Sequence, residues 1–478
     1  MQKKLLAAAV LSALAGGVSA QSANVTLYGT LQGSFEFASA TGADGTAAAP
    51  AGSASSTRTG ALGLAYSANP ASQSTRTRMN PAGSNFGLRG SEDLGNGMSA
   101  WFQIEIATTL GAPPPNAGVN HGNAPSFRNT AVGLRSNTWG SIGFGSWDTP
   151  FNLIAVSTAQ ANGRSGAAST GFQANLLGAT TFGYGAWSAQ NAANACLAAA
   201  GGGANAGCFN YGTNFDRRER GGLMWWSPNW NGFEARVHYH ATMDGNAVTA
   251  DNRVNGGPAL KPNIWSMSLA YTNGPLAVGY AYDRQNDILA YGVNLAGGYA
   301  ATGVGTGAFT LAGGAGAAAA NMSGSKGTGH RLGGKYAFNL GGGSSIGVSA
   351  MWESLKWTMN YTNQAAAAVD LSELKKTAWR LQGNFTTGKH FFGLEYTRAN
   401  ELKGSIAGGN GFNGGGTDAR GIILSYNYMM SKRTSLTAYY TDVNNSTNAN
   451  YSGIVFGGIA TAAGADPKYY GLYVRHAF

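Results

Sequence analysis

The sequence predicts an all-β fold: a sixteen-stranded antiparallel β-barrel that crosses a membrane. Three observations lead to this prediction. Strand-like segments alternate apolar and polar residues with a period of two, so that each strand has one apolar and one polar face. Their connections alternate between short and long along the chain. Charged residues make up only 11% of the 478 residues, against about 25% in soluble domains.

The first twenty residues predict a secretory signal peptide. Lys3 and Lys4 precede an apolar run at 5–18, and Val18-Ser19-Ala20 has the small-x-small pattern of a cleavage site. The run is shorter than the roughly 18 apolar residues of a membrane-spanning helix. We therefore expect one mature barrel, from residue 21 to residue 478.

The expected strands follow one another from residue 24. In the first, Val25, Leu27 and Leu31 alternate with polar neighbours. A long loop rich in Ala, Ser and Thr then extends to about residue 80. The next two strands form a hairpin at 84–105. The remaining strands are expected at 127–135, 141–146, 222–226, 233–242, 264–271, 276–283, 330–338, 345–356, 377–385, 390–397, 421–429, 435–442 and 468–478.

The connections indicate a membrane barrel more specifically. Turns such as 136–140, 272–275 and 386–389 are short, whereas 147–218 is the longest connection. Successive connections of an antiparallel sheet lie at opposite ends, so all the long loops are expected at one end. Outer-membrane barrels have this arrangement, with tight periplasmic turns and long extracellular loops.

The hairpin at 84–105 defines the two faces of the wall. Phe86 and Leu88 alternate with polar residues, as do Phe102 and Ile104. Sixteen strands enclose a space too wide for side chains to fill, which leaves an aqueous channel. The polar faces are therefore expected to point inward and the apolar faces outward to lipid.

Five motifs occur in a recognisable order. They are Val25-Thr-Leu-Tyr-Gly29, Phe86-Gly-Leu-Arg-Gly-Ser-Glu-Asp-Leu-Gly95, Ala131-Val-Gly-Leu134, Ser227-Pro-Asn229 and Val474-Arg-His-Ala-Phe478. Together they resemble the general diffusion porins of betaproteobacteria, of the Neisseria, Burkholderia and Comamonas type. The resemblance implies a homotrimer in the outer membrane of a Gram-negative bacterium, with both termini in the periplasm. It also implies that the third extracellular loop, 147–218, folds into the lumen and constricts the pore.

The resemblance bears on partners and on selectivity. The terminal Phe478 resembles the signature by which barrel-assembly machinery accepts such chains, and the surroundings are expected to be outer-membrane lipid and lipopolysaccharide. Ser146 and Met224 stand where family members commonly carry arginine. We therefore expect only a weak to moderate anion preference.

Seven charged residues are candidates for the pore constriction. Arg89 and Glu105 share the polar face of the hairpin, and Arg128 and Arg135 bracket the next strand. Arg128 has the parity of outward residues, so it must lie above the lipid or beside a bulge. The acidic candidates from the expected constriction loop and its edges are Asp148, Asp216 and Glu219, which would supply the acidic side that opposes the basic wall. Parity places Arg236, Arg331, Lys335 and Arg380 on the wider lumen wall.

The expected function is passive diffusion of small hydrophilic solutes and ions. After loss of Lys3 and Lys4 the formal charge falls from +10 to about +8, which favours anions if the basic groups line a channel. A substrate-specific channel with a lumen binding site is the alternative, and an outer-membrane enzyme or an adhesin are further rivals. Because the chain is exported from the cytoplasm, no nucleic-acid partner is expected.

The sequence indicates no enzyme and no cofactor. His238 and His240 lie two apart on one face, but no third ligand accompanies them, so no metal site is expected. No Ser–His–Asp arrangement is evident. Cys196 and Cys208 are the two cysteines, and in an exported protein we expect them to form a disulfide.

Overall fold

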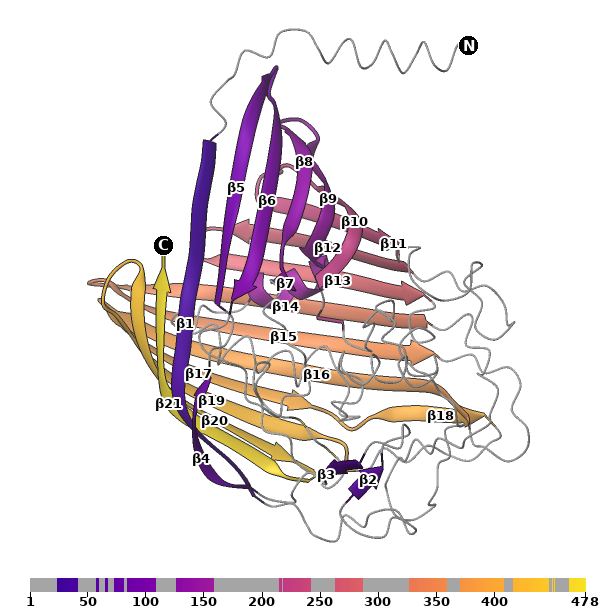
Figure 1. Ribbon diagram of the computed structural model, residues 1–478, viewed down its shortest axis with the longest axis vertical. Coiled ribbons are helices and arrows are strands. Elements are labelled where there is room, and N and C mark those ends of the chain that lie inside the picture. Colours follow the sequence, from indigo (N-terminus) through magenta and orange to yellow (C-terminus); the bar gives the residue numbers. More distant parts are fainter. Residues whose placement is uncertain are drawn as a thin grey trace.

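The computed structural model describes residues 24–41, 57–59, 65–67, 73–80, 84–108, 126–158, 215–216, 218–241, 263–286, 326–358, 370–407, 416–446, 449, 451 and 464–478. Within these ranges the chain forms a closed antiparallel barrel (Figure 1). The predicted signal peptide and the predicted Cys196–Cys208 disulfide lie outside the described residues.

Sixteen wall strands make up the ring. Each is either one continuous strand or two consecutive strands separated by a short interruption. The first eight wall strands are β1 (Asn24–Thr41), β4 (Gln73–Asn80) with β5 (Ser84–Gly95), β6 (Met98–Thr108), β7 (Ser126–Phe127) with β8 (Thr130–Ser136), β9 (Gly140–Asp148), β10 (Arg218–Trp226), β11 (Phe233–Ala241) and β12 (Asn263–Asn273).

The second eight continue around the ring to its starting point. They are β13 (Leu276–Asn286), β14 (Lys326–Gly341), β15 (Ser344–Thr358), β16 (Asp370–Thr387), β17 (His390–Ala399) with β18 (Lys403–Ala407), β19 (Ala419–Met429), β20 (Thr434–Asn445) and β21 (Asp466–Ala477). β2 (Thr57–Thr59) and β3 (Ala65–Ser67) form a separate two-stranded sheet.

Pairing of the first and last strands closes the barrel. β1 pairs with β21 from Thr30 opposite Ala477 to Thr41 opposite Asp466. On its other side β1 pairs with β5 and, further along, with β4. The ring therefore has no open edge, which the hydrocarbon of a bilayer would not tolerate. The sixteen predicted strands are confirmed, but the predicted loop up to residue 80 is too long, because it contains β4.

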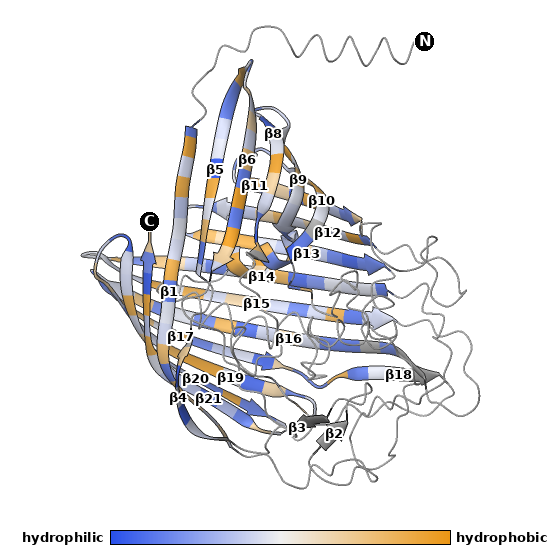
Figure 2. Ribbon diagram, in the orientation of Figure 1, coloured by the Kyte–Doolittle hydropathy of each residue, from blue (hydrophilic) through white to orange (hydrophobic). Residues whose placement is uncertain are grey.

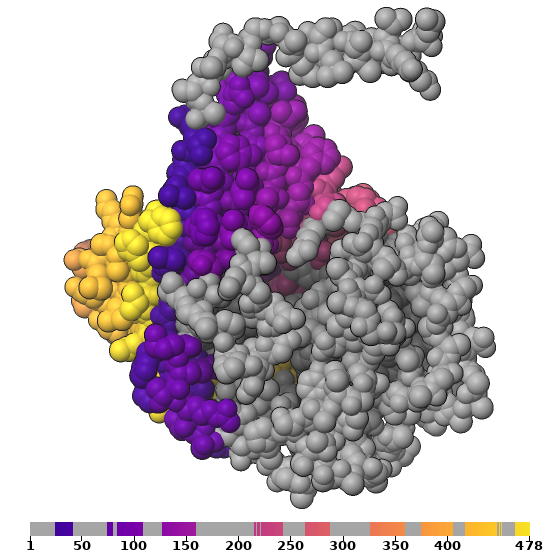
Figure 3. All heavy atoms as spheres, viewed as in Figure 1, coloured from indigo at the N-terminus to yellow at the C-terminus, as the bar shows by residue number. Residues whose placement is uncertain are grey.

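The two faces of the wall differ as the period-two pattern predicts. Large apolar side chains such as Leu27, Leu88, Leu223 and Leu332 are exposed on the outside. Hydrophobic and hydrophilic residues alternate along the strands in Figure 2. In the space-filling view of Figure 3, the side chains of β1, β5 and β6 form a continuous outer face next to the last strand. Among the described residues, no helix has the length and apolarity needed to cross a membrane.

Tight turns join neighbouring strands at one end of the barrel. The β5–β6 turn has left-handed backbone at Gly95, Asn96 and Gly97, a conformation that glycine and asparagine tolerate best. In the β14–β15 turn, Gly341, Gly342 and Gly343 also have positive φ angles. Because an even number of antiparallel strands forms the ring, the start of β1 and the end of β21 lie on the same side of the barrel as these turns. There Gly29 and Phe478 exchange backbone hydrogen bonds.

Candidate pore constriction

A short helix follows β9 at the start of the predicted constriction loop. Helix α2 (Pro150–Ser157) is capped by the preceding Thr149, whose side chain accepts a hydrogen bond from the backbone N–H of Asn152 at 3.3 Å. Pro150 occupies the first turn, where its missing N–H is not needed. At the other end, the backbone N–H and the hydroxyl of Thr158 both donate to the carbonyl of Ile154. Local capping thus accounts for both ends of α2.

Helix α2 lies inside the barrel, against β12, β13 and β14. The backbone N–H of Phe151 donates to the hydroxyl of Ser266 on β12 at 3.2 Å. Ile154 packs over Gly279 on β13, and Thr158 packs over Gly333 on β14. Both glycines belong to the inward-facing sets of their strands, so the beginning of the loop after β9 occupies the lumen.

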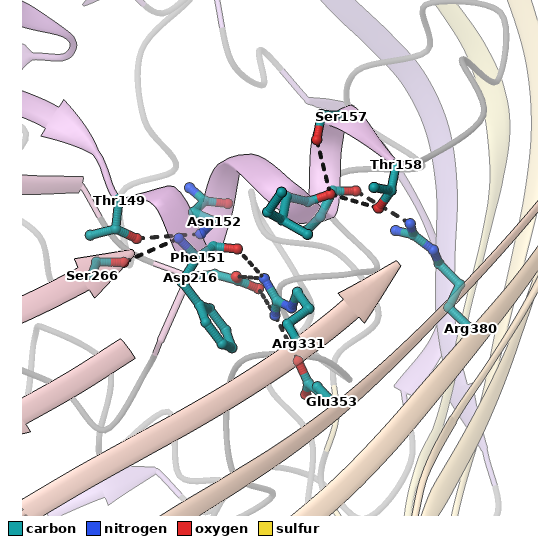
Figure 4. A network of polar contacts seen from close by, with 12 residues as sticks. Thr149, Phe151, Asn152, Ser157, Thr158, Asp216, Ser266, Arg331, Glu353 and Arg380 are labelled. Atoms are coloured by element: carbon teal, nitrogen blue, oxygen red, sulfur yellow. Dashed lines mark hydrogen bonds and ion pairs between the residues drawn. The ribbon is translucent and has the colours of Figure 1, made fainter. Parts of the chain in front are cut away.

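Arg331 on β14 joins α2 to the barrel wall (Figure 4). Its guanidinium donates to the carbonyl of Phe151 at 3.0 Å and lies 4.1 Å from the centre of the Phe151 ring. It also forms ion pairs with Asp216 at 2.5 Å and with Glu353 at 2.7 Å. Asp216 lies near the far end of the 147–218 segment, so one buried side chain holds two distant parts of that segment.

Arg380 on β16 contacts the C-terminal end of α2. Its Nη2 donates to the carbonyl of Ala155 at 3.3 Å, in the last turn, where carbonyl groups lack helical partners and the helix dipole favours a cation. Lys376 on the same strand is 4.0 Å from Glu353. Arg331, Lys376 and Arg380 are all fully buried in this wall.

The acidic residues of this wall balance its basic ones. Three carboxylates lie near the three buried cations Arg331, Lys376 and Arg380; they are those of Asp216, Glu353 and Glu395. Glu395 on β17 accepts a hydrogen bond from Gln382, which is two residues from Arg380 on the neighbouring strand. We call these six residues the paired wall. Its three cations and three anions leave no net charge.

A second group of predicted residues lies on the opposite side of the ring. β5 and β14 are separated by the same number of wall strands in either direction around the ring, so they lie opposite each other. Arg89 on β5 is exposed, and its guanidinium lies 5.1 Å from the centre of the Tyr28 ring on β1. The hydroxyl of Tyr28 donates to Glu105 at 3.1 Å, and Glu105 forms an ion pair with Arg128 at 2.5 Å. We call these four residues the open wall.

A bulge explains how Arg128 reaches Glu105. Phe127 pairs with Ile106, but Ala131 pairs with Gln103. Four residue steps on one strand therefore match three steps on its neighbour, which is the geometry of a β-bulge. The backbone N–H of Arg128 donates to the carbonyl of Glu105. The extra residue reverses the side on which Arg128 lies, in agreement with one of the two expectations from parity.

Asp148 and Glu219 lie beside this bulge, where β9 meets β10. Asp148 pairs with Arg218 at 3.0 Å, and Asn129 contacts both side chains. Glu219 is buried next to a register shift between β9 and β10. The acidic candidates are thus divided between two places. Asp216 lies on the side of the ring opposite Arg89, where it pairs with Arg331, whereas Asp148 pairs with Arg218 beside the bulge.

Three other basic candidates are dispersed along the inner wall. Arg135 is exposed near the β8–β9 turn, and Arg236 on β11 lies 3.7 Å from Glu234. Lys335 on β14 is partly buried, four residues from Arg331. Within the described residues, no carboxylate lies within ion-pair distance of Arg89 or Arg135.

Sequence reasoning missed Lys376 of the paired wall and Tyr28 of the open wall, as well as two arginines elsewhere on the inner wall. Tyr28 has inward parity, but nothing in the pattern connects it to Arg89. Arg218 escaped notice because it stands at the edge of the long loop. Arg78 on β4 pairs with the buried Glu36 of β1 at 2.5 Å, in a strand that was not predicted.

An aromatic cluster covers part of the inner wall between β6 and β11. The rings of Trp101, Trp147 and Trp226 lie 5.1–6.0 Å apart. Trp226 donates its indole N–H to His238, and the rings of His238 and His240 are 5.7 Å apart. In the part of the chain described by the structure, no group of three or more potential ligands is arranged to hold a metal ion.

Comparison with known proteins agrees with this architecture. The profile of the family described as Gram-negative porin matches residues 7–448. An outer membrane porin protein of Bordetella pertussis is 28% identical over 212 residues, which are 43% of this chain and 42% of that protein. The aligned part thus spans less than half of that relative.

Solved structures share the fold at low identity. An anion-selective porin from Comamonas acidovorans superposes with a TM-score of 0.56 at 17% identity, over 95% of this chain and all of that one. OmpT of Vibrio cholerae gives a TM-score of 0.52 at 12% identity, over 96% of this chain and 99% of that one.

Proposed function

This chain belongs to the Gram-negative porin family of the outer membrane, and we propose that it forms a passive, water-filled channel for small hydrophilic solutes and ions. Helix α2 inside the closed barrel carries the proposal, because it narrows a lumen that sixteen strands alone leave wide. Solutes cross by diffusion down their gradients, and the space between α2 and the open wall limits their size.

We propose a weak to moderate anion preference for this channel. On the paired wall, Arg331 and Lys376 form ion pairs with carboxylates, and Arg380 is buried beneath α2 near Glu395, so these cations contribute little field to the lumen. Arg89 and Arg135 are exposed and have no such partner among the described residues. Charged side chains lining a pore set its selectivity. The Comamonas porin that shares this fold is anion-selective, which agrees with the direction proposed for this chain.

Electrical recording in a planar bilayer tests both parts of this proposal. Purified protein should produce stepwise conductance, and a potassium chloride gradient should give a zero-current potential that indicates chloride preference. Absence of conductance from correctly folded barrels would reject the channel, as expected of a closed adhesin. A potential of the opposite sign would reject the anion preference.

We propose that the channel assembles as a homotrimer surrounded by outer-membrane lipid and lipopolysaccharide. The exposed apolar face of β1, β5 and β21 supports contact with lipid or with neighbouring copies. Phe478 follows the last strand, β21, and is the feature expected to engage barrel-assembly machinery. Light scattering in detergent should give three chains per particle, and a monomer would contradict the assembly.

A substrate-specific channel with a lumen binding site is the second candidate. The cluster of Trp101, Trp147 and Trp226 favours it, because aromatic rings on an inner wall suit the faces of sugars or aromatic acids. Benzoate and glucose are suitable probes. Reversible block of the ionic current by either would favour binding, whereas unimpeded current would favour simple diffusion.

A further inference from the structure

The depth at which α2 lies against the wall determines how far it projects into the lumen. Building on the proposed channel function, we propose that three inward-facing glycines, Gly279, Gly329 and Gly333, set the cross-section of the pore. We call them the glycine seat. The size limit would then depend on the wall under the helix as well as on the loop that carries the helix.

The glycine seat is in close contact with α2 and Phe215. A Cβ atom added at Gly279 would lie 2.6 Å from Cδ1 of Ile154. At Gly329 it would lie 2.8 Å from Phe215 and 3.0 Å from Phe151. At Gly333 it would lie 2.2 Å from the hydroxyl of Thr158. Side chains of the inserted segment thus occupy the space that any larger residue would need.

Backbone conformation gives no separate reason for glycine here. Other glycines of this protein have positive φ, as at the β5–β6 turn, but none of these three does. Gly279 and Gly333 are directly paired across β13 and β14, in regular strand where a glycine lowers stability relative to alanine. Space for α2 is the remaining explanation.

Polar contacts hold the helix down on this seat. Ser266 binds the backbone N–H of Phe151, while Arg331 and Arg380 bind the carbonyls of Phe151 and Ala155. These anchors reach both ends of α2 from β12, β14 and β16, and Arg331 stands between Gly329 and Gly333 on β14. A side chain added beneath the helix is therefore expected to push it toward the barrel axis.

The three positions should differ in the displacement they cause. Cδ1 of Ile154 is the end of a flexible side chain, which can turn away from a methyl group at residue 279. Thr158 is short and is held by two hydrogen bonds to Ile154. An alanine at 333 therefore requires the backbone to shift by about 1 Å to regain ordinary contact.

Single-channel conductance of Gly333→Ala is the principal test. We expect a partial loss of conductance and a lower size limit for neutral sugars in liposome swelling. Gly279→Ala should show a smaller loss. The ratio of chloride to potassium permeability should stay unchanged, because no charge is altered. Gly383→Ala is the matched control, since a Cβ there meets nothing within 4 Å.

A second pair of variants separates displacement from misfolding. Ile154→Val removes the atom closest to residue 279, so Ile154→Val with Gly279→Ala should conduct like the Ile154→Val single variant. Heat-modifiable migration in gels should show folded barrels for every variant. Unchanged or increased conductance in Gly333→Ala would overturn the role of the glycine seat. A wild type that does not conduct would instead reject the proposed channel.

Discussion

The paired wall and the open wall both present basic residues to the lumen, but they use them differently. On the paired wall, Arg331 is buried; it donates a hydrogen bond to α2 and forms ion pairs with Asp216 and Glu353. On the open wall, Arg89 is exposed and rests on Tyr28. Strand parity identifies both arginines as inward. Only their neighbours distinguish a cation that holds a loop from one that can act on passing ions.

Loss of Arg331 should have the largest effect on this comparison. Arg331→Met removes the guanidinium that forms ion pairs with Asp216 and Glu353, and breaking a buried pair of this kind lowers stability by about 3–5 kcal/mol. We expect a lower midpoint of unfolding in guanidinium chloride, together with larger and noisier currents as α2 loses its anchor. Wild-type stability and quiet currents would contradict the anchoring role.

Neutralising Glu105 should make the open wall more positive. Glu105→Gln removes the carboxylate that pairs with Arg128 at 2.5 Å, so two arginines would face the lumen without a compensating charge. The zero-current potential should shift further toward chloride. Glu353→Gln serves as the contrasting variant: it should reduce stability more than it alters selectivity. A shift toward potassium in Glu105→Gln would show that the open wall is assigned incorrectly.

Removing the ring under Arg89 should have the smallest effect. Tyr28→Leu keeps an apolar side chain but abolishes a cation–π contact of about 0.5–1 kcal/mol. Arg89 would sample more positions, so we expect a modest rise in open-channel noise with little change in mean conductance. Tyr28→Phe, which keeps the ring, should leave the noise at the wild-type level. Equal noise in Tyr28→Leu and the wild type would argue against stacking as a restraint.

The sequence pattern predicted most of the barrel wall, because a strand with one face toward lipid and the other toward water alternates apolar and polar residues with a period of two. Strand β4 was missed because Gln73–Asn80 is polar on both faces and shows no such alternation. Arg128 could be placed only between two alternatives, because the bulge that turns it inward leaves no mark in the pattern.

The candidate site was less predictable than the wall. Arg331 was expected on the lumen wall, but its contacts with Phe151 and Asp216 span 180 and 115 residues of sequence. No local pattern indicates such a contact. The partners of the acidic candidates likewise depend on tertiary packing, because Asp148 pairs with Arg218 and Asp216 with Arg331, far along the chain.

The zero-current potential of Arg89→Ala tests the central claim most directly. Wild type, Arg89→Ala and the turn control Lys389→Ala would be compared in the same potassium chloride gradient. If the open wall sets ion preference, Arg89→Ala should lose part or all of the chloride preference while Lys389→Ala keeps it. An unchanged potential in Arg89→Ala, or a wild type that prefers potassium, would contradict the account.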